Sequence, residues 1–267
     1  MGEERLPEKN EFALEYSLGR SLKGKTAIVT GATRGIGRAC ARAFAKCGAN
    51  LVLNGINTKG LGDLAAELGR YRVGRVVVAG DIAKRETAES LARQAMEAYG
   101  RLDILVNNAG VMVRAPFLDT PEEEWRRLMD VNYHGALYAC QAVLPAMIRQ
   151  GGGSIVNISS AAAKTCHGNS HPSYGASKAA LLSLTQKLAL DMGPSHIRVN
   201  AVCPGPTASE MTEQWSAGYR AKVLAGIPLG RMGTPEDQAA AVLFLASDLA
   251  SFITGESINV NGGRYMN

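Results

Sequence analysis

The chain has 267 residues, of which 46% are hydrophobic and 20% charged, and its net charge is +5. This composition is ordinary for a folded globular protein and excludes a disordered chain or a small disulfide scaffold. No apolar run approaches the roughly 18 residues that cross a bilayer, and the polar start of the chain lacks the apolar stretch of a signal peptide. We therefore expect a cytoplasmic protein without membrane contact.

The distribution of charge and the spacing of the cysteines limit the classes of binding partner that we expect. Basic residues are spread along the chain with acidic residues between them, which argues against a nucleic-acid surface and favours a small-molecule substrate, an anionic one in particular. The 5 cysteines have neither metal-site nor redox-dithiol spacing. We expect free thiols, packed in the core, and no bound metal.

The order of the predicted elements indicates the fold. Residues 1–22 are polar with little periodicity and are interpreted as an arm before one domain over 23–267. From there, short β-rich runs alternate with longer helical patterns. The expected strands cover residues 25–30, 50–54, 75–79, 103–106, 153–159, 197–202 and 257–260. This alternation predicts a doubly wound α/β fold of the Rossmann type, a single seven-stranded parallel sheet with helices on both faces.

Helix boundaries are marked in the local sequence. Thr120-Pro121 and Thr234-Pro235 each place a hydroxyl cap before a proline and acidic residues. Gly193-Pro194 ends a helix that begins near Pro172, and this helix is apolar around more than one face. It is therefore expected to be internal or to pack against another subunit.

A glycine-rich turn directly follows the first strand and opens an apolar helix. Glycines allow the backbone to turn tightly and to approach a pyrophosphate, whose charge the amides at the helix start then meet. A plain tight turn is the alternative, but the strand, turn and helix context favours dinucleotide binding. The residues expected at the cofactor are Gly31, Thr33, Arg34, Gly35, Ile36 and Gly37.

A tyrosine and a lysine form a second candidate group. Tyr174 and Lys178 lie four residues apart, so a helix places the phenol and the ammonium on one face. A nearby cation lowers a tyrosine pKa from about 10 by about 1–3 units, towards acid/base work. Taken alone, such a pair is more often a solvated helix face. Upstream, however, a strand ends in Ser159-Ser160, where a parallel sheet places ligand-facing groups.

Together these segments resemble the short-chain dehydrogenase/reductase family, over nearly everything from Lys23 onward. The matching segments are residues 30–37, Asn107 to Gly110, Val131 to Gly135, Ser160, the Tyr174 and Lys178 pair, Pro204-Gly205, and Val260 to Gly263. The resemblance implies an NAD(P)-dependent oxidoreductase that interconverts a secondary alcohol and a ketone. It also implies a homotetramer, with the 172–192 helix and the 235–263 segment at interfaces.

The resemblance assigns roles to individual residues. Tyr174 is the implied general acid/base, and Ser160 hydrogen-bonds the same substrate oxygen. Lys178 binds the nicotinamide ribose, and Asn132 holds a water that links Lys178 to solvent. The spacing from Ser160 to Tyr174 is one residue longer than in similar enzymes, so Ser159 stays an alternative. The further implied cofactor residues are Asp81, Ile82, Asn108, Ala109, Gly110, Tyr174, Lys178, Pro204, Gly205, Thr207 and Ser209.

Cofactor choice depends on the end of the second strand. A carboxylate there hydrogen-bonds the adenosine ribose of NAD and repels a 2′-phosphate, but the chain has Gly55 and Ile56 at this point. The Arg34 guanidinium can form an ion pair with a 2′-phosphate. We therefore favour NADP(H), with NAD(H) as the alternative.

The segments that flank the nicotinamide in the family are basic here. No Asp or Glu occurs in residues 161–173, and the candidate substrate residues are Arg114, Lys164 and His167. We expect a 3-oxoacyl-type or small anionic hydroxy or keto substrate, gripped by Arg114. The alternative is that these cations lie in solvent or at a subunit contact. Residues 207–226, with Trp215 and Tyr219, are expected to form a lid.

Two other functions stay open. Within the enzymes, an NAD-dependent sugar or polyol dehydrogenase is the alternative. In another class, a non-catalytic dinucleotide-binding regulator would have the same fold. A regulator is expected to lose the Tyr174 and Lys178 pair, whereas this chain keeps both.

Overall fold

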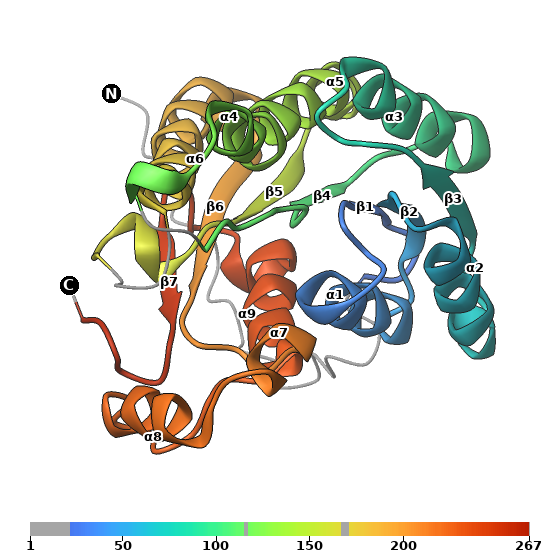
Figure 1. The fold of residues 1–267 in the computed structure, drawn as a ribbon. Coiled ribbons are helices and arrows are strands. Elements are labelled where there is room, and N and C mark those ends of the chain that lie inside the picture. Colours follow the sequence, from blue (N-terminus) through green and yellow to red (C-terminus); the bar gives the residue numbers. More distant parts are fainter. Residues whose placement is uncertain (1–21, 115–116, 167–170, 267) are drawn as a thin grey trace, which may run out of the picture.

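The computed structural model describes residues 22–114, 117–166 and 171–266. Seven strands form one parallel sheet in the order β3-β2-β1-β4-β5-β6-β7 (Figure 1). The strands are β1 (Thr26–Val29), β2 (Asn50–Gly55), β3 (Arg75–Ala79), β4 (Ile104–Asn107), β5 (Gly153–Ile158), β6 (Ile197–Pro204) and β7 (Ser257–Val260). The expected seven-stranded parallel sheet is confirmed.

Helices cover both faces of the sheet (Figure 1). α1, α2 and α9 pack on one face, and α3, α5 and α6 pack on the other, with α4 beside α6. α7 and α8 follow β6, and α8 lies next to the carboxyl-terminal segment. Their bounds are α1 (Gly35–Lys46), α2 (Thr58–Glu67), α3 (Arg85–Tyr99), α4 (Glu122–Met129), α5 (Gly135–Gln150), α6 (Pro172–Met192), α7 (Glu210–Glu213), α8 (Ala217–Ala225) and α9 (Pro235–Ala246).

Each strand of the sheet centre contributes to two hydrophobic cores. In β1, Ala27 and Val29 face the core under α1 and α9, whereas Ile28 faces the core under α3 and α5. Successive side chains of a strand point to opposite faces, so a sheet covered on both sides needs apolar residues at every position. This explains why β1 is buried throughout.

The helix boundaries agree with the local signals at α9 and differ at α4. Thr234 Oγ1 accepts from the Asp237 amide at 3.1 Å, and the Asp237 carboxylate accepts from the Thr234 amide at 2.7 Å, a capping box at α9. α4 begins at Glu122, with Pro121 as its N-cap, so the expected cap position of Thr120 was wrong by one residue. The fixed φ of proline suits either position.

The described cysteines are free thiols, as expected, and four of them are buried. Cys166 is exposed, so the expected core position was wrong for this residue. It lies in the segment between β5 and α6. In the described ranges, no helix combines the length and apolar character of a membrane span.

The connections out of β1 and β4 run to opposite sides, because β1 pairs with β2 on one side and with β4 on the other. In open parallel sheets, ligands bind outside the carboxyl ends of the strands at this reversal point. The turns after β1, β4, β5 and β6 therefore surround the candidate site.

Candidate active site

The turn after β1 leaves no room for side chains at two glycines. Gly31 has a φ of 62°, and a Cβ there would lie 2.8 Å from the Cα of Ala109. A Cβ at Gly37 would collide with the carbonyl group of Gly31. α1 starts at Gly35, and its N-cap Arg34 makes no side-chain cap hydrogen bond, so the first amides of α1 are not capped by it. This turn has the shape and polarity that a pyrophosphate requires.

Hydrogen bonds tie the turn after β1 to the turn after β4. Thr30 Oγ1 accepts from the amides of Asn108 and Ala109, both at 3.0 Å. Asn108 Nδ2 donates to the carbonyl oxygens of Thr30 at 2.9 Å and Gly31 at 3.0 Å. The Asn108 side chain therefore shapes the glycine turn from behind, and its amide group is already bonded to protein atoms.

The end of β2 carries no acidic side chain. Asn54 is buried and donates to the carbonyl oxygens of Val78 at 3.1 Å and Gly80 at 3.0 Å, so it fastens β2 to β3. A Cβ at Gly55 would lie 3.0 Å from Thr33 Cγ2, and Ile56 is exposed. A side chain at position 55 would therefore crowd Thr33.

An arginine cluster that was not predicted from the sequence stabilises the same turn. Arg38 Nη1 donates to the Thr33 carbonyl at 3.3 Å, and Arg38 Nη2 donates to Glu67 at 2.6 Å. Arg42 and Arg70 also bind the Glu67 carboxylate. Hydrogen bonds from Arg42 and Arg38 lower the pKa of Glu67 to about 2. The spacing of Arg38 and Arg42 by one helical turn was a signal for this cluster.

Asp81 lies in the turn after β3 with both carboxylate oxygens occupied. Oδ1 accepts from the Ala83 amide at 3.0 Å, and Oδ2 lies 2.8 Å from Arg127 Nη1 of α4. Ile82 is buried against Gly135 at the start of α5. Nothing in the sequence pattern pointed to Arg127, because α4 and this turn are far apart along the chain.

Tyr174 and Ser160 are brought together at the carboxyl end of β5. The Ser160 hydroxyl acts on the Tyr174 phenol and lowers its pKa, although the residues come from the end of a strand and from α6. Ser160 Oγ also accepts from the Ala162 amide at 3.1 Å. Ser159 instead donates to the main-chain carbonyl of Lys178 at 2.8 Å. Of the two serines that the sequence left open, the structure places Ser160 against Tyr174 and Ser159 under α6.

Lys178 lies behind Tyr174 and is buried. Its ammonium donates to the Ile158 carbonyl at 2.8 Å and lies 6.0 Å from the centre of the Tyr174 ring. A Cβ at Gly110 would lie 3.3 Å from Lys178 Nζ, so glycine lets the turn after β4 approach the ammonium. Burial lowers the pKa of Lys178 to about 8.

Burial acts on Tyr174 as well. Desolvation raises the pKa of Tyr174 above 10.0, and the hydrogen bond from Ser160 opposes this rise. The net shift of the Tyr174 pKa is upward, so the expected net lowering is wrong for the protein alone. The free energy lost when the phenolate is removed from water exceeds the stabilisation that its polar neighbours provide.

Asn132 lies in a π-helical segment, Asp130–His134, between α4 and α5. Its Oδ1 accepts from the Val111 amide at 2.8 Å, and its Nδ2 donates to the Val111 carbonyl at 2.9 Å and to Ser177 Oγ at 3.0 Å. Ser177 Oγ in turn donates to the Tyr174 carbonyl at 2.8 Å. The extra residue of a π turn is frequent at functional sites, and here it brings Asn132 to α6.

The turn after β6 supplies the opposite side of the site. The Gly205 amide donates to the Val260 carbonyl at 3.1 Å, and the Cβ of Asn261 leaves no space for a side chain at Gly205. Thr207 Oγ1 donates to the Gly205 carbonyl at 3.0 Å. Ser209 precedes α7, and its amide donates to Thr212 Oγ1 at 2.9 Å. The hydroxyl groups of Thr207 and of Thr212 in α7 thus hold the Pro204 to Ser209 turn.

Of the three candidate substrate residues, the structure describes two, and these two do not converge. The Arg114 guanidinium lies 5.7 Å from the centre of the Trp215 ring, which packs edge-on against Tyr219 at 5.0 Å. Lys164 Nζ donates to the Ser257 carbonyl and to Asn259 Oδ1, both at 3.0 Å, so it is engaged with β7. His167 lies outside the described residues. Arg114 is therefore the described cation that faces the expected lid.

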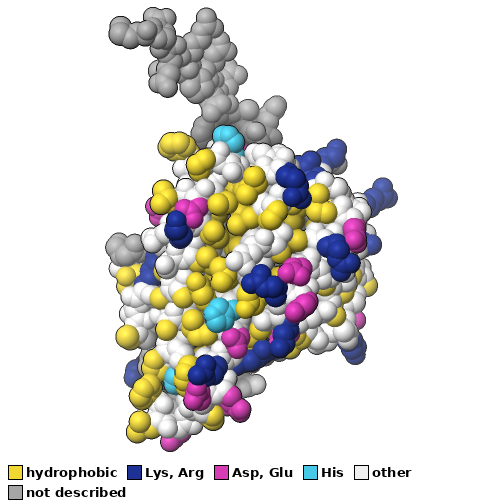
Figure 2. Space-filling model, turned by 90° about the horizontal axis from the view of Figure 1, so that it is seen from above, with side chains coloured by type: hydrophobic (Ala, Val, Ile, Leu, Met, Phe, Trp, Pro, Cys, Tyr) yellow, Lys and Arg dark blue, Asp and Glu magenta, His cyan; other side chains and the backbone are white. Residues whose placement is uncertain are grey.

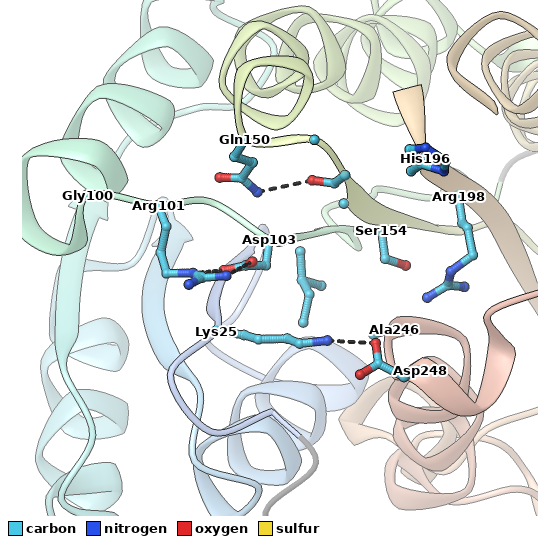
Figure 3. A pocket seen from close by; sticks show the side chains of 14 residues that line it. Lys25, Gly100, Arg101, Asp103, Gln150, Ser154, His196, Arg198, Ala246 and Asp248 are labelled. Atoms are coloured by element: carbon cyan, nitrogen blue, oxygen red, sulfur yellow. Dashed lines mark hydrogen bonds and ion pairs between the residues drawn. The ribbon is translucent and has the colours of Figure 1, made fainter. Parts of the chain in front are cut away.

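A cavity of about 530 Å³ lies at the opposite, amino edge of the sheet (Figure 3). It is lined by the loop before β5 and by charged side chains that pair with each other. Arg101 binds Asp103 at 2.7 Å, and Lys25 binds Asp248 at 2.8 Å. None of the candidate catalytic residues lines this cavity. The hydroxyl, ammonium and amide groups described above all lie at the carboxyl edge.

The chain is similar to known proteins over most of its length. A family profile described as Enoyl-(Acyl carrier protein) reductase matches residues 31–264. L-rhamnose 1-dehydrogenase (NAD(P)(+)) of Sphingomonas sp. (strain SKA58) is 40% identical over 250 residues, which cover 92% of this chain and 98% of that protein. A 3-oxoacyl-(acyl-carrier-protein) reductase of Thermotoga maritima is 38% identical over 245 residues, covering 91% and 98%.

Solved structures show the same architecture. A short-chain type dehydrogenase/reductase from Mycobacterium marinum superposes with a TM-score of 0.87 at 35% sequence identity. The match covers 92% of this chain and 97% of that one.

Proposed function

The chain belongs to the short-chain dehydrogenase/reductase family and is an NAD(P)-dependent oxidoreductase acting on CH–OH groups, and we propose that it interconverts a secondary alcohol and a ketone with Tyr174 as general acid/base. One observation carries the proposal: the Ser160 hydroxyl acts on the Tyr174 phenol and opposes the rise of its pKa, and the buried Lys178 ammonium lies 6.0 Å from the centre of the Tyr174 ring. Residues 23–267 form one dinucleotide-binding and catalytic domain in this proposal, and the free thiols support a cytoplasmic location.

The described residues fit a dinucleotide. The glycine turn at Gly31 and Gly37 excludes any Cβ, and the start of α1 offers amides without a side-chain cap from Arg34. The remaining residues that would hold the cofactor are Thr33, Gly35, Ile36, Asp81, Ile82, Asn108, Ala109, Gly110, Tyr174, Lys178, Pro204, Gly205, Thr207 and Ser209. When bound, the nicotinamide supplies or accepts the hydride.

The protein's own residues then transfer the proton. Tyr174 donates its phenolic proton to the ketone oxygen during reduction and accepts it back during oxidation. Ser160, which acts on the Tyr174 phenol, donates a hydrogen bond to the same oxygen. Lys178 stabilises the phenolate by its charge, and a water held near Asn132 returns the proton from solvent. A raised tyrosine pKa suits a proton donor, because the phenol stays protonated until the oxygen develops charge.

A preference for NADP(H) is part of the proposal. It is supported by the missing acid at Gly55 and Ile56 and by the exposed Arg34 at the start of α1. Arg38 adds to this support, because it fixes the Thr33 carbonyl next to Arg34. NAD(H) is the alternative, since the name of the Sphingomonas relative includes both cofactors.

For the substrate, we propose a 3-oxoacyl-type or small anionic hydroxy or keto compound bound by Arg114. The position of the Arg114 guanidinium against Trp215 of the lid segment supports this assignment. A sugar or polyol dehydrogenase is the second candidate, favoured by the 40% identity to a protein named L-rhamnose 1-dehydrogenase. A non-catalytic regulator fits less well, because Tyr174, Lys178, Ser160 and Asn132 are all present.

The proposed assembly is a homotetramer with α6 and residues 235–263 at interfaces. Figure 2 shows a band of hydrophobic side chains on the side of the molecule that carries α4, α5 and α6. Leu190 of α6 is 75% exposed and Phe252 is 103% exposed, which is costly for side chains in water.

The proposed function is tested by comparing the wild type with Tyr174→Phe. Ketones, sugars and secondary alcohols are screened with both nicotinamide cofactors at 340 nm. We expect turnover to fall by roughly 10²–10⁴-fold in the variant while cofactor binding changes little. A variant that keeps more than about a tenth of wild-type activity would contradict the assignment of Tyr174.

A further inference from the structure

The turn after β3 contacts α4 through one ion pair. Arg127 Nη1 lies 2.8 Å from Asp81 Oδ2, and Asp81 Oδ1 accepts from the Ala83 amide at 3.0 Å. Because both oxygens are engaged, the carboxylate has a fixed orientation. The neighbouring Arg126 makes no such contact and pairs with Glu122 of its own helix at 2.6 Å.

The same turn also contacts the start of α5. Ile82 is buried, and a Cβ at Gly135 would lie 2.8 Å from Ile82 Cγ2 and 3.1 Å from the Ile82 carbonyl oxygen. Only a glycine at position 135 permits this approach without a shift of the main chain. Asp81 and Ile82 thus hold the chain at two points, one in α4 and one at the start of α5.

Between these two points lies the π-helical segment Asp130–His134 with Asn132. Asn132 is buried, and its amide group bonds to Val111 and Ser177. A movement of the turn after β3 must therefore be transmitted to both ends of the segment that carries Asn132. Packed elements transmit small shifts in this way, because interiors have little free space.

We propose that Arg127 is a positioning residue: through Asp81 it holds the adenine end of the cofactor site and the Asn132 segment in one arrangement. The inference rests on the proposed function, in which Asp81 and Ile82 contact the adenine and Asn132 holds the water that returns the proton from solvent. Arg127 itself belongs to neither the adenine end of the cofactor site nor the group of residues that transfers the proton. The Arg127 side chain is 47% exposed and the Asp81 side chain 27%, so the pair is expected to contribute little to folding stability.

Arg127→Ala is the test, with Arg126→Ala as the matched control on the same helix. Affinity for 2′,5′-ADP and ADP-ribose is measured by calorimetry on the protein without nicotinamide. The value of kcat and its pH profile are measured at saturating cofactor, and the thermal unfolding midpoint of each variant is recorded. These readouts separate fragment binding, chemistry and folding.

For Arg127→Ala we expect the Kd of the better-bound fragment to rise by roughly threefold to fivefold. We expect kcat to fall with a displaced pH profile, because Asn132 loses its fixed position. Arg126→Ala should change none of these values by as much as about twofold. A rise in Kd with unchanged kcat and pH profile would overturn the coupling, and so would equal behaviour of the two variants.

Two further variants keep the test decisive if Arg127→Ala unfolds more easily. Arg127→Lys retains the positive charge and should recover most of the fragment affinity. In an Asp81→Asn background, Arg127→Ala should have no additional effect on Kd, because the pair is already broken. Full additivity would overturn the proposal. If the wild type binds neither fragment, the proposed function fails together with this inference.

Discussion

Ser159 Oγ donates a hydrogen bond of 2.8 Å to the main-chain carbonyl of Lys178. This contact joins the end of β5 to the middle of α6, one helical turn after Tyr174. It engages the Ser159 hydroxyl, whereas Ser160 Oγ accepts from the Ala162 amide at 3.1 Å and acts on the Tyr174 phenol. Two adjacent serines therefore have different tasks, one in the packing of α6 and one in the candidate site.

The two serines should respond differently to removal of the hydroxyl. Ser160→Ala is expected to lower kcat by roughly 10²-fold, because a hydrogen-bond donor to the reacting oxygen is lost. Ser159→Ala should lower the free energy of unfolding by about 0.5–1.5 kcal/mol, with a far smaller effect on kcat. Steady-state kinetics and urea unfolding of both variants check this. The reverse pattern would assign the chemistry to Ser159.

The pH dependence of stability should reveal the buried ammonium of Lys178. Burial lowers its pKa from 10.5 to about 8, so between these values the unfolded chain holds a proton that the folded protein has released. The free energy of unfolding contributed by Lys178 therefore rises with pH across this window.

Lys178→Met removes this contribution and provides the reference. The difference in unfolding free energy between wild type and variant, measured by urea denaturation without cofactor, should shift in favour of the wild type from pH 8 to pH 10. A constant difference across this range would mean that the folded protein does not depress this pKa.

Arg34 should govern the choice of cofactor. Arg34→Glu places a carboxylate at the start of α1 and is expected to repel a 2′-phosphate, so the ratio of kcat/KM for NADPH over NADH should reverse. Arg93→Glu, on the solvent face of α3, is the charge-matched control, since Arg93 pairs only with groups of its own helix. A wild type with a lower KM for NADH than for NADPH contradicts the preference outright.

Arg114 should discriminate anionic from neutral substrates. Arg114→Ala is expected to raise KM for an anionic hydroxy or keto compound by about tenfold and to leave its neutral ester or amide nearly unchanged. Lys164→Ala is the matched control, because that ammonium bonds to Ser257 and Asn259 of β7. Equal KM changes for the anion and the neutral compound would reject the anionic-substrate proposal.

The exposed apolar side chains predict an oligomer. Light scattering at micromolar concentration should give the mass of a tetramer for the wild type. Leu190→Glu in α6 places a charge on the proposed interface and should lower that mass, because an unpaired charge is costly to bury. A stable wild-type monomer at this concentration would contradict the proposed assembly.

Much of this protein can be predicted from local sequence. The alternation of β-rich and helical runs determined the parallel sheet, because strands buried on both faces must be apolar throughout. The Thr234 to Asp237 capping box and the glycine turn at Gly31 are likewise local, since each depends on a few adjacent residues. These features can be predicted without knowledge of any contact between distant segments.

The tertiary structure decided what depends on distant contacts and burial. Arg127 meets Asp81 only because α4 and the turn after β3 are brought together, and Lys164 turns to β7 for the same reason. The direction of the Tyr174 pKa shift also escaped the sequence, which shows a cation four residues away but not the loss of water around the phenol. Spacing along a helix reports which groups are near each other, whereas solvation is set by every segment that packs around them.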